Sequence, residues 1–162
     1  MKNNLSETIS KVYELIGEHT PLICDCGIYC NGKCCTGDDK DGMLLFPGEK
    51  EYFENNDAYR VFFDERYNSF AVSCKGSCIR DQRPLSCRIF PYQFYYDKKS
   101  ERINVAPDIR AVDYCPLLKN NIKINKKFLR SLRISALKLQ SDPQCLEYIK
   151  HISSILTDFN II

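Results

Sequence analysis

The sequence predicts an α+β fold in a single domain that spans residues 1–162. Three observations support this prediction. Apolar residues recur at helical spacing near both ends of the chain, and short β-prone runs separated by turn residues occupy its middle. A cysteine-rich stretch over 24–42 shows neither period. The length of 162 residues suits one domain, and a hydrophobic fraction of 44% is enough to build a core.

The first helix is predicted over 4–17, because one of its faces is apolar at helical spacing. Asn4 is expected to cap it, with Glu7 at the capping-box position, and Gly17 is expected to end it. The apolar residues of that face are Leu5, Ile9, Val12 and Ile16.

The middle of the chain predicts short antiparallel strands and two short helices. Strands are expected over 43–46, 60–64, 69–73, 92–97 and 102–105, the last two as a β-hairpin. Pro47 and Arg83-Pro84 are expected to open short helices, since proline suits the first helical turn. Pro91 is expected to end the second of them.

Two further helices are predicted at the C-terminal end, within about 125–158. The first, over 125–140, carries one apolar stripe: Phe128, Leu132, Ala136 and Leu139. Asp142 is expected to cap the second, with Pro143 at its first position. Its apolar face consists of Leu146, Ile149, Ile152 and Leu156. These helices are expected to form an antiparallel hairpin that packs on the small sheet.

Charge and hydropathy favour a soluble cytoplasmic protein. The net charge is only +2, the first residues lack the apolar region of a secretory signal, and no apolar run reaches membrane-spanning length. Nucleic acid and membrane are therefore not expected as partners of the chain as a whole. In a reducing compartment its 10 cysteines are expected to be metal ligands or catalytic thiols rather than disulfides.

Eight of these cysteines form a pattern typical of metal ligation. Two pairs, Cys26/Cys30 and Cys74/Cys78, each enclose three residues, a span that can bend round one ion. The complete predicted ligand set is Cys26, Cys30, Cys34, Cys35, Cys74, Cys78, Cys87 and Cys115. Eight thiolates suffice for two four-thiolate sites, or for one cluster and one ion. The metal-organised core of the domain is thus expected over about 24–118, because ligation can order a loop that hydrophobic burial does not.

Zinc is the expected metal, with iron or an iron–sulfur cluster as the alternative. The cysteine spacing does not match the bacterial ferredoxin run, yet it excludes neither metal. Arg83 and Arg88 flank Cys87 and are expected to offset thiolate charge. The two histidines are expected to be structural or solvent-facing rather than ligands, and Cys24 and Cys145 to lie outside the ligand set.

These residues resemble the YkgJ-type cysteine-cluster family of zinc- or iron-chelating domains. The resemblance rests on a cysteine cluster that ends in Cys34-Cys35, on the pair Cys74 and Cys78, and on a late Cys115-Pro116. Its most specific part is the segment Arg83-Pro84-Leu85-Ser86-Cys87-Arg88-Ile89-Phe90-Pro91. The resemblance implies metal chelation. A similar domain occurs in flagellin lysine N-methylase, so it also leaves open an enzymatic role.

Three hypotheses for function follow. The first is a protein that holds zinc or iron through clustered thiolates, with a protein partner. The second is an iron–sulfur or metal-dependent protein-modifying enzyme, although no glycine-rich cofactor fingerprint is present. The third is an RNA- or protein-interaction module that uses a basic face over 119–138. That face consists of Lys119, Lys123, Lys126, Lys127, Arg130, Arg133 and Lys138.

Overall fold

The computed structural model describes residues 5–34, 41–75, 79–113 and 115–158 and confirms the α+β class. The α-helices are α1 (Glu7–Ile16), α2 (Gly27–Cys30), α3 (Lys50–Glu54), α4 (Leu85–Ile89), α5 (Pro116–Lys119), α6 (Lys126–Gln140) and α7 (Pro143–Asp158). The strands are β1 (Met43–Leu44), β2 (Tyr59–Asp64), β3 (Ser69–Cys74), β4 (Tyr92–Asp97) and β5 (Arg102–Pro107). Two short 3₁₀ turns are η1 (Arg80–Gln82) and η2 (Ile109–Ala111).

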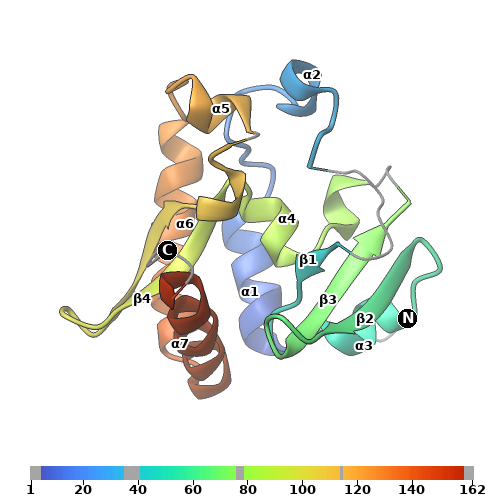
Figure 1. Ribbon diagram of the computed structural model, residues 1–162, viewed down its shortest axis with the longest axis vertical. Coiled ribbons are helices and arrows are strands. Elements are labelled where there is room, and N and C mark those ends of the chain that lie inside the picture. Colours follow the sequence, from blue (N-terminus) through green and yellow to red (C-terminus); the bar gives the residue numbers. More distant parts are fainter. Residues whose placement is uncertain (1–4, 35–40, 76–78, 114, 159–162) are drawn as a thin grey trace.

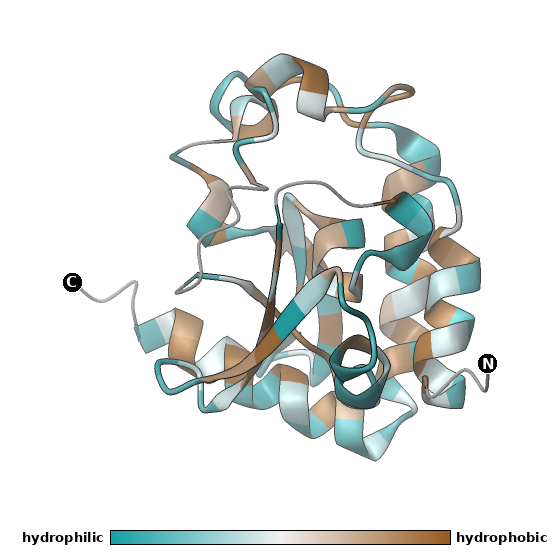
Figure 2. Cartoon of the chain, turned by 90° about the vertical axis from the view of Figure 1, so that its right-hand side faces the viewer, coloured by the Kyte–Doolittle hydropathy of each residue, from teal (hydrophilic) through white to brown (hydrophobic). Residues whose placement is uncertain are grey.

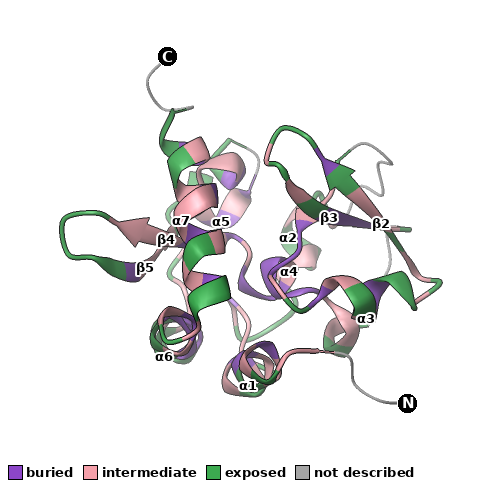
Figure 3. Ribbon diagram, turned by 90° about the horizontal axis from the view of Figure 1, so that it is seen from below, coloured by how far each residue is buried: buried purple, intermediate pink, exposed green. Residues whose placement is uncertain are grey.

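The strands form two separate antiparallel units on opposite sides of α1 and α4 (Figures 1 and 3). A three-stranded sheet of order β1-β3-β2 lies on one side, with α3 against it, and the β4–β5 hairpin lies on the other with α6 and α7. The short helices α2 and α5, which carry or adjoin cysteines, lie near each other at one end of the molecule (Figure 1).

The N-terminal helix begins later than expected. Ser6, not Asn4, is the N-cap: its backbone is extended and its hydroxyl accepts a hydrogen bond of 3.3 Å from the amide of Ile9. Glu7 is therefore the first helical residue rather than the capping-box acid. Gly17 ends the helix as expected, because its φ of 48° is one that glycine adopts at little cost.

The apolar faces predicted for α1 and α6 converge in one core with Leu146 and Ile149 of α7 (Figures 2 and 3). The other two residues of the α7 face, Ile152 and Leu156, pack in a second cluster with Leu44 and Ala71 of the three-stranded sheet. Hydrophobic residues recur along these helices between hydrophilic ones, as expected for helices that are buried on one side. The core cluster combines residues of α1, α4, both strands of the hairpin, α6 and α7, and its fully buried members include Ile9, Val12, Phe128 and Leu132. Leu146, expected on the apolar face of α7, packs against this cluster while only partly buried.

Both C-terminal helices begin at a capping side chain, of which only Asp142 was predicted as a cap. Asn125 caps α6 by accepting from the amide of Lys127 at 3.0 Å, and Asp142 caps α7 by accepting from Gln144 and Cys145. α7 turns back from the end of α6, and the two helices pack on the β4–β5 hairpin (Figure 1).

Side chains of these two helices also satisfy both edges of the hairpin. Tyr96 of β4 and Ile103 of β5 lie opposite each other. The amide of Tyr96 donates to Ser153 Oγ of α7 at 2.8 Å, and the amide of Ile103 donates to Gln140 Oε1 of α6 at 2.9 Å. Edge amides that would otherwise be left unpaired are thus bonded to a helix on each side.

Candidate functional site

Four of the predicted ligands line one small cavity. Cys26 is the N-cap of α2, Cys30 is the last residue of that helix, and Cys34 follows one turn later. Cys115, the N-cap of α5, reaches the same cavity from a distant part of the sequence. The cavity has a volume of about 20 Å³, and Lys33, Phe90, Pro91 and Leu117 complete its lining. The close approach of α2 and α5 (Figure 1) thus brings the first cysteine cluster and the late cysteine together.

The thiols around this cavity are close enough to influence one another. Burial raises the pKa of the Cys26 thiol, and the neighbouring Asp25, Cys30 and Cys115 raise it further. The guanidinium of Arg83 acts in the opposite direction. Arg83 therefore lies where the sequence placed it, as a positive charge near the thiols.

A second group of cysteines lines a larger cavity next to the first. Cys74 ends β3 and Cys87 lies in α4, and both face a cavity of about 590 Å³. Cys34 lines both cavities, so they share one wall. Cys35 and Cys78, the other two predicted ligands, lie outside the described residues.

The described cysteines line two neighbouring cavities, but their thiols do not form a metal coordination sphere. Across residues 5–34, 41–75, 79–113 and 115–158, no three His, Cys, Asp or Glu side chains lie close enough together to hold a metal ion. Among the described members of the predicted set, Cys26, Cys30, Cys74 and Cys115 are free thiols. The ligation predicted for the eight cysteines thus stays a prediction, whereas the grouping of six of them around two neighbouring cavities is observed.

The two cysteines expected to lie outside the ligand set line neither cavity. Cys24 is exposed. Cys145 is buried in the main core, where burial and then Asp142 raise the pKa of its thiol to about 12. Both positions therefore offer controls for substitutions of the cavity cysteines.

Arg88 has a structural role that the sequence did not reveal. Its side chain is buried, its Nε donates to the carbonyl of Arg83 at 2.8 Å, and an Nη donates to the carbonyl of Asp81. Its guanidinium lies 4.0 Å from the centroid of the Tyr13 ring. These contacts hold the Arg-Pro segment in place, and the predicted role of Arg88 in offsetting thiolate charge stays a prediction.

A buried carboxylate, Glu49, organises the surroundings of α4. It is fully buried and accepts hydrogen bonds of 2.7 Å from the amides of Phe46 and Leu85, together with one from the Tyr13 hydroxyl. Burial raises the pKa of Glu49, and its three hydrogen bonds and the charge of Arg88 oppose this shift without overcoming it. Glu49 thereby ties α1 to the start of α4, the helix that carries Cys87.

Sequence reasoning missed Glu49 as a site-forming residue. It was visible only as an acid at the start of a short helix, beside Glu51 and Glu54, which are exposed. Its burial arises from the packing of α1 and α4 against the 46–49 turn, which involves residues far apart in the sequence.

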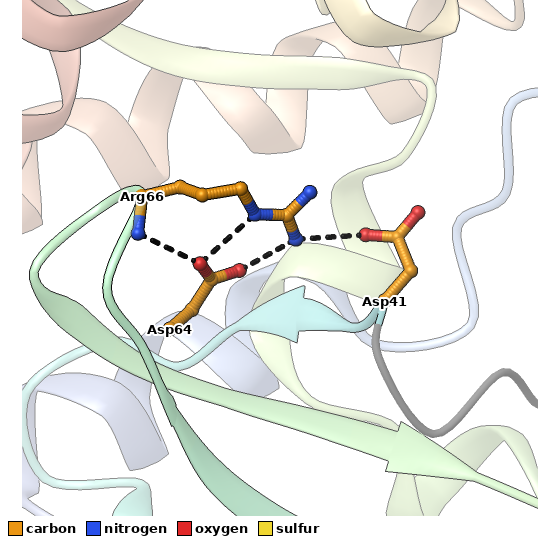
Figure 4. Close-up of polar contacts among 3 residues, drawn as sticks. All are labelled: Asp41, Asp64 and Arg66. Carbon is orange, nitrogen blue, oxygen red and sulfur yellow. Dashed lines mark hydrogen bonds and ion pairs between the residues drawn. The ribbon is translucent and has the colours of Figure 1, made fainter.

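Two arginine–aspartate pairs with the same geometry lie at the larger cavity, whose lining includes Arg66, Asp108 and Arg110 but not Asp64. In Asp64-Glu65-Arg66 the amide and Nε of Arg66 each donate to Asp64 Oδ1 at 3.0 Å, and Nη2 donates to Oδ2 at 2.7 Å (Figure 4). In Asp108-Ile109-Arg110 the corresponding distances are 2.9, 2.9 and 2.7 Å. Both aspartates are nearly inaccessible, at 5% and 2% exposure. Such bidentate pairing fixes a guanidinium in one orientation.

Electrostatics reinforces both pairs. The hydrogen bond from Arg66 holds the pKa of Asp64 below its usual range, although burial opposes this. Burial lowers the pKa of Arg110, but the hydrogen bond and charge of Asp108 outweigh it, so the net shift is upward.

Asp64 is expected to make folding stability depend on acidity. Because its pKa in the folded state is lowered from 3.8, its contribution is present above pH 3.8 and is lost as the pH falls through the lower folded value. Urea unfolding between pH 5 and about pH 2 is expected to show a steeper loss of stability in the wild type than in Asp64→Asn. Asp57→Asn, at an exposed position, is the control. Identical slopes for the wild type and Asp64→Asn would contradict the pairing.

The two histidines have structural contacts, as expected. His151 Nε2 lies 2.8 Å from the carbonyl oxygen of Tyr67, which joins α7 to the turn between β2 and β3. The carbonyl of His19 accepts from Arg80 Nη2 at 2.6 Å. Neither histidine lines the two cavities.

The basic face over 119–138 is largely exposed to solvent. Six of its seven residues are exposed and Lys138 is half-buried. Exposed charges of this kind are usual on a helix that is buried on its opposite side. A role in binding RNA or protein thus stays a prediction.

Comparisons with protein-family models, with curated proteins and with solved structures found no significant match. The resemblance to the YkgJ-type family therefore stays a prediction from the cysteine motif. In the part of the chain that the structure describes, every helix is too short or too polar to cross a membrane.

Proposed function

We propose that the protein binds a metal ion, zinc in the first instance, through cysteine thiolates that include Cys26, Cys30, Cys34 and Cys115. The observation that carries the proposal is the cavity that these four side chains line, with Cys115 brought to it by α5. Four thiolates are the donor set of a structural zinc site. A volume of about 20 Å³ is close to that of a single water-sized sphere, which suits one ion.

A divalent cation would stabilise thiolates at this place in addition to Lys33, which also lines the cavity. The pKa of the Cys26 thiol is raised by burial and by the negative charges near it, so its ionised form is disfavoured without a compensating charge. A divalent cation supplies that charge and stabilises thiolates. Closure to zinc–sulfur distances of about 2.3 Å requires the cysteine-bearing loop and α5 to move together. Ligation and local folding are therefore expected to be coupled.

A second candidate function is a metal-dependent, protein-modifying enzyme of the lysine N-methylase kind. It is favoured by the larger cavity, which Cys34, Cys74 and Cys87 line beside the first group. A catalytic metal keeps an open coordination position next to a substrate pocket, whereas a structural one is closed by four protein ligands. The two functions are distinguished by the number of metal ions bound and by whether one of them is bound at Cys34, Cys74 and Cys87.

Metal content is expected to fall sharply in Cys115→Ser. Serine cannot supply a thiolate, and loss of one of four ligands exposes the ion to chelators. The measurement is elemental analysis of anaerobically purified protein, together with its visible absorption spectrum: a colourless zinc protein is expected, whereas a broad sulfur-to-iron band would indicate the iron alternative. Cys24→Ser, at an exposed cysteine outside both cavities, is expected to retain wild-type metal content.

Cys87→Ser tests the second cysteine group in the same assay. A partial loss of metal in Cys87→Ser beside a partial loss in Cys115→Ser would indicate two centres. Wild-type content in Cys87→Ser would leave a single centre at the smaller cavity. Equal metal content in Cys115→Ser, Cys24→Ser and the wild type would refute the proposal.

A further inference from the structure

The cavity of about 590 Å³ has a wall built from two fixed arginines and one tyrosine. Arg66, Tyr67 and Arg110 all line it. The guanidinium carbons lie 5.7 Å (Arg66) and 5.6 Å (Arg110) from the centroid of the Tyr67 ring. Each arginine is held by bidentate hydrogen bonds to its own aspartate, Arg66 to Asp64 and Arg110 to Asp108. The wall thus presents two oriented cations near one aromatic ring.

The guanidinium groups of Arg66 and Arg110 are accessible to solvent, whereas the aspartates that bind them are buried. The side chain of Arg66 is 54% exposed and that of Arg110 is 32% exposed, against 5% and 3% for their partners. Within the described residues, the side-chain hydrogen bonds of Arg66 use Nε and Nη2 and leave Nη1 without an acceptor. Figure 4 shows this third nitrogen turned away from both carboxylates. A guanidinium that is anchored on one edge and accessible on another is pre-organised to bind an oxyanion.

A surface carboxylate marks how such an anion would bind. Asp41 reaches Arg66 Nη2 from the side opposite Asp64, at 3.3 Å, while it is itself 73% exposed (Figure 4). This contact is longer than the 2.7 Å contact to Asp64 and is open to solvent, so it contributes little to stability. It shows that an oxygen anion can approach Arg66 from the accessible side.

The rest of the cavity wall is largely apolar and includes Met43, Val72 and Phe90. Its volume lies in the range of sites for small organic molecules, about 300–1,000 Å³. Lys33 and Arg83 add further positive charge, against the carboxylates of Asp41 and Asp108. An apolar pocket with a few convergent cations matches a ligand that has an apolar body and an anionic group.

We infer that this cavity binds a small organic anion, with its carboxylate or phosphate group against Arg66 and Arg110 and its apolar body against Met43, Val72 and Phe90. The site stands on the arginine wall and does not depend on a bound metal. Since Cys34, Cys74 and Cys87 line the same cavity, the ligand would lie beside the second thiol group.

The experiment is isothermal titration calorimetry of the full chain with four probes: phenyl phosphate, benzoate, inorganic phosphate and the neutral benzyl alcohol. At least one aryl anion is expected to bind tighter than inorganic phosphate and benzyl alcohol, because it alone satisfies both parts of the site. Phenyl phosphate and benzoate distinguish a phosphate from a carboxylate ligand. Arg66→Gln is expected to weaken binding about tenfold or more, the usual effect of losing a hydrogen bond to a charged group.

Two further variants sharpen the test. Asp41→Ala is expected to bind the aryl anion at least as tightly as the wild type, because it removes a competing carboxylate. Arg130→Gln, an exposed arginine of α6 outside the cavity, is the matched control and is expected to bind like the wild type. Thermal unfolding of each variant shows whether the variant is folded at the temperature of the titration, so that a loss of binding caused by unfolding is recognised.

Two outcomes would overturn the inference. One is the absence of millimolar or tighter binding of both aryl anions by the folded wild type. The other is equal affinity in Arg66→Gln and the wild type. The titration is repeated after chelation to distinguish this site from a bound metal. Binding that is lost on chelation but is unchanged in Arg66→Gln would mean that the anion binds a metal ion. That result would refute the arginine site. Retained binding in Cys115→Ser would support it even if the metal proposal fails.

Discussion

Replacement of Glu49 by alanine is expected to destabilise the folded protein by about 3–5 kcal/mol, the range for removing one member of a buried charged network. The carboxylate accepts from two buried amides, those of Phe46 and Leu85, and from the Tyr13 hydroxyl. Alanine leaves these donors without their acceptor, and each buried unsatisfied donor costs about 1–3 kcal/mol. It also leaves the buried charge of Arg88 without its nearby carboxylate.

Urea unfolding at neutral pH measures this change through the shift of the midpoint at constant slope. Glu51→Ala, in the first turn of the neighbouring α3, is the matched control because its side chain is exposed. Its effect is expected to stay within about 0.5 kcal/mol. A similar effect of both substitutions would mean that the hydrogen bonds of Glu49 do not stabilise the fold.

Replacement of Arg88 by methionine is expected to cost about 3 kcal/mol, close to the effect of the Glu49 change. Methionine retains much of the apolar packing but removes the donors to the carbonyls of Arg83 and Asp81 and the cation over the Tyr13 ring. It leaves those carbonyls and Glu49 in a buried environment without the positive charge.

A double-mutant cycle with Glu49→Ala tests whether the two residues act in one network. A coupling of about 0.5–3 kcal/mol is expected for charges that share a buried site. Arg83→Met provides the contrast, because Arg83 lines the larger cavity and acts on the Cys26 thiol. If Arg88→Met changed the reactivity of Cys87 toward a thiol reagent with no loss of stability, Arg88 would instead serve the thiolates.

Most helices and strands could be predicted because their signals are local. The apolar stripe from Phe128 to Leu139 lies within α6, and the Asp142-Pro143 signal lies at the start of α7. Residues close together in the sequence therefore determine that these two helices form. The β4–β5 hairpin is likewise a local unit, since its strands are joined by a short turn. The prediction of a strand over 43–46 was less accurate. Only Met43–Leu44 forms a strand, because Phe46 enters the buried 46–49 turn.

The cysteine spacing indicated which thiols to consider, and six of them do line two neighbouring cavities. It could not indicate how they divide between those cavities. Cys115 meets Cys26 and Cys30 only because α5 packs beside α2, and Cys87 faces the larger cavity only because α4 is fixed by Glu49 and Arg88.

The amino-acid sequence by itself determined the α+β class, the Asp142 cap of the last helix and the amphipathic faces that form the core. These depend on side-chain periodicity and on hydrogen bonds between residues a few positions apart. Only the tertiary structure decided the burial of Glu49 and the placement of both Arg66 and Arg110 near the Tyr67 ring. The physical reason is that desolvation and charge pairing depend on which distant segments meet, and an acid or arginine destined for a buried network looks locally the same as one that stays in water.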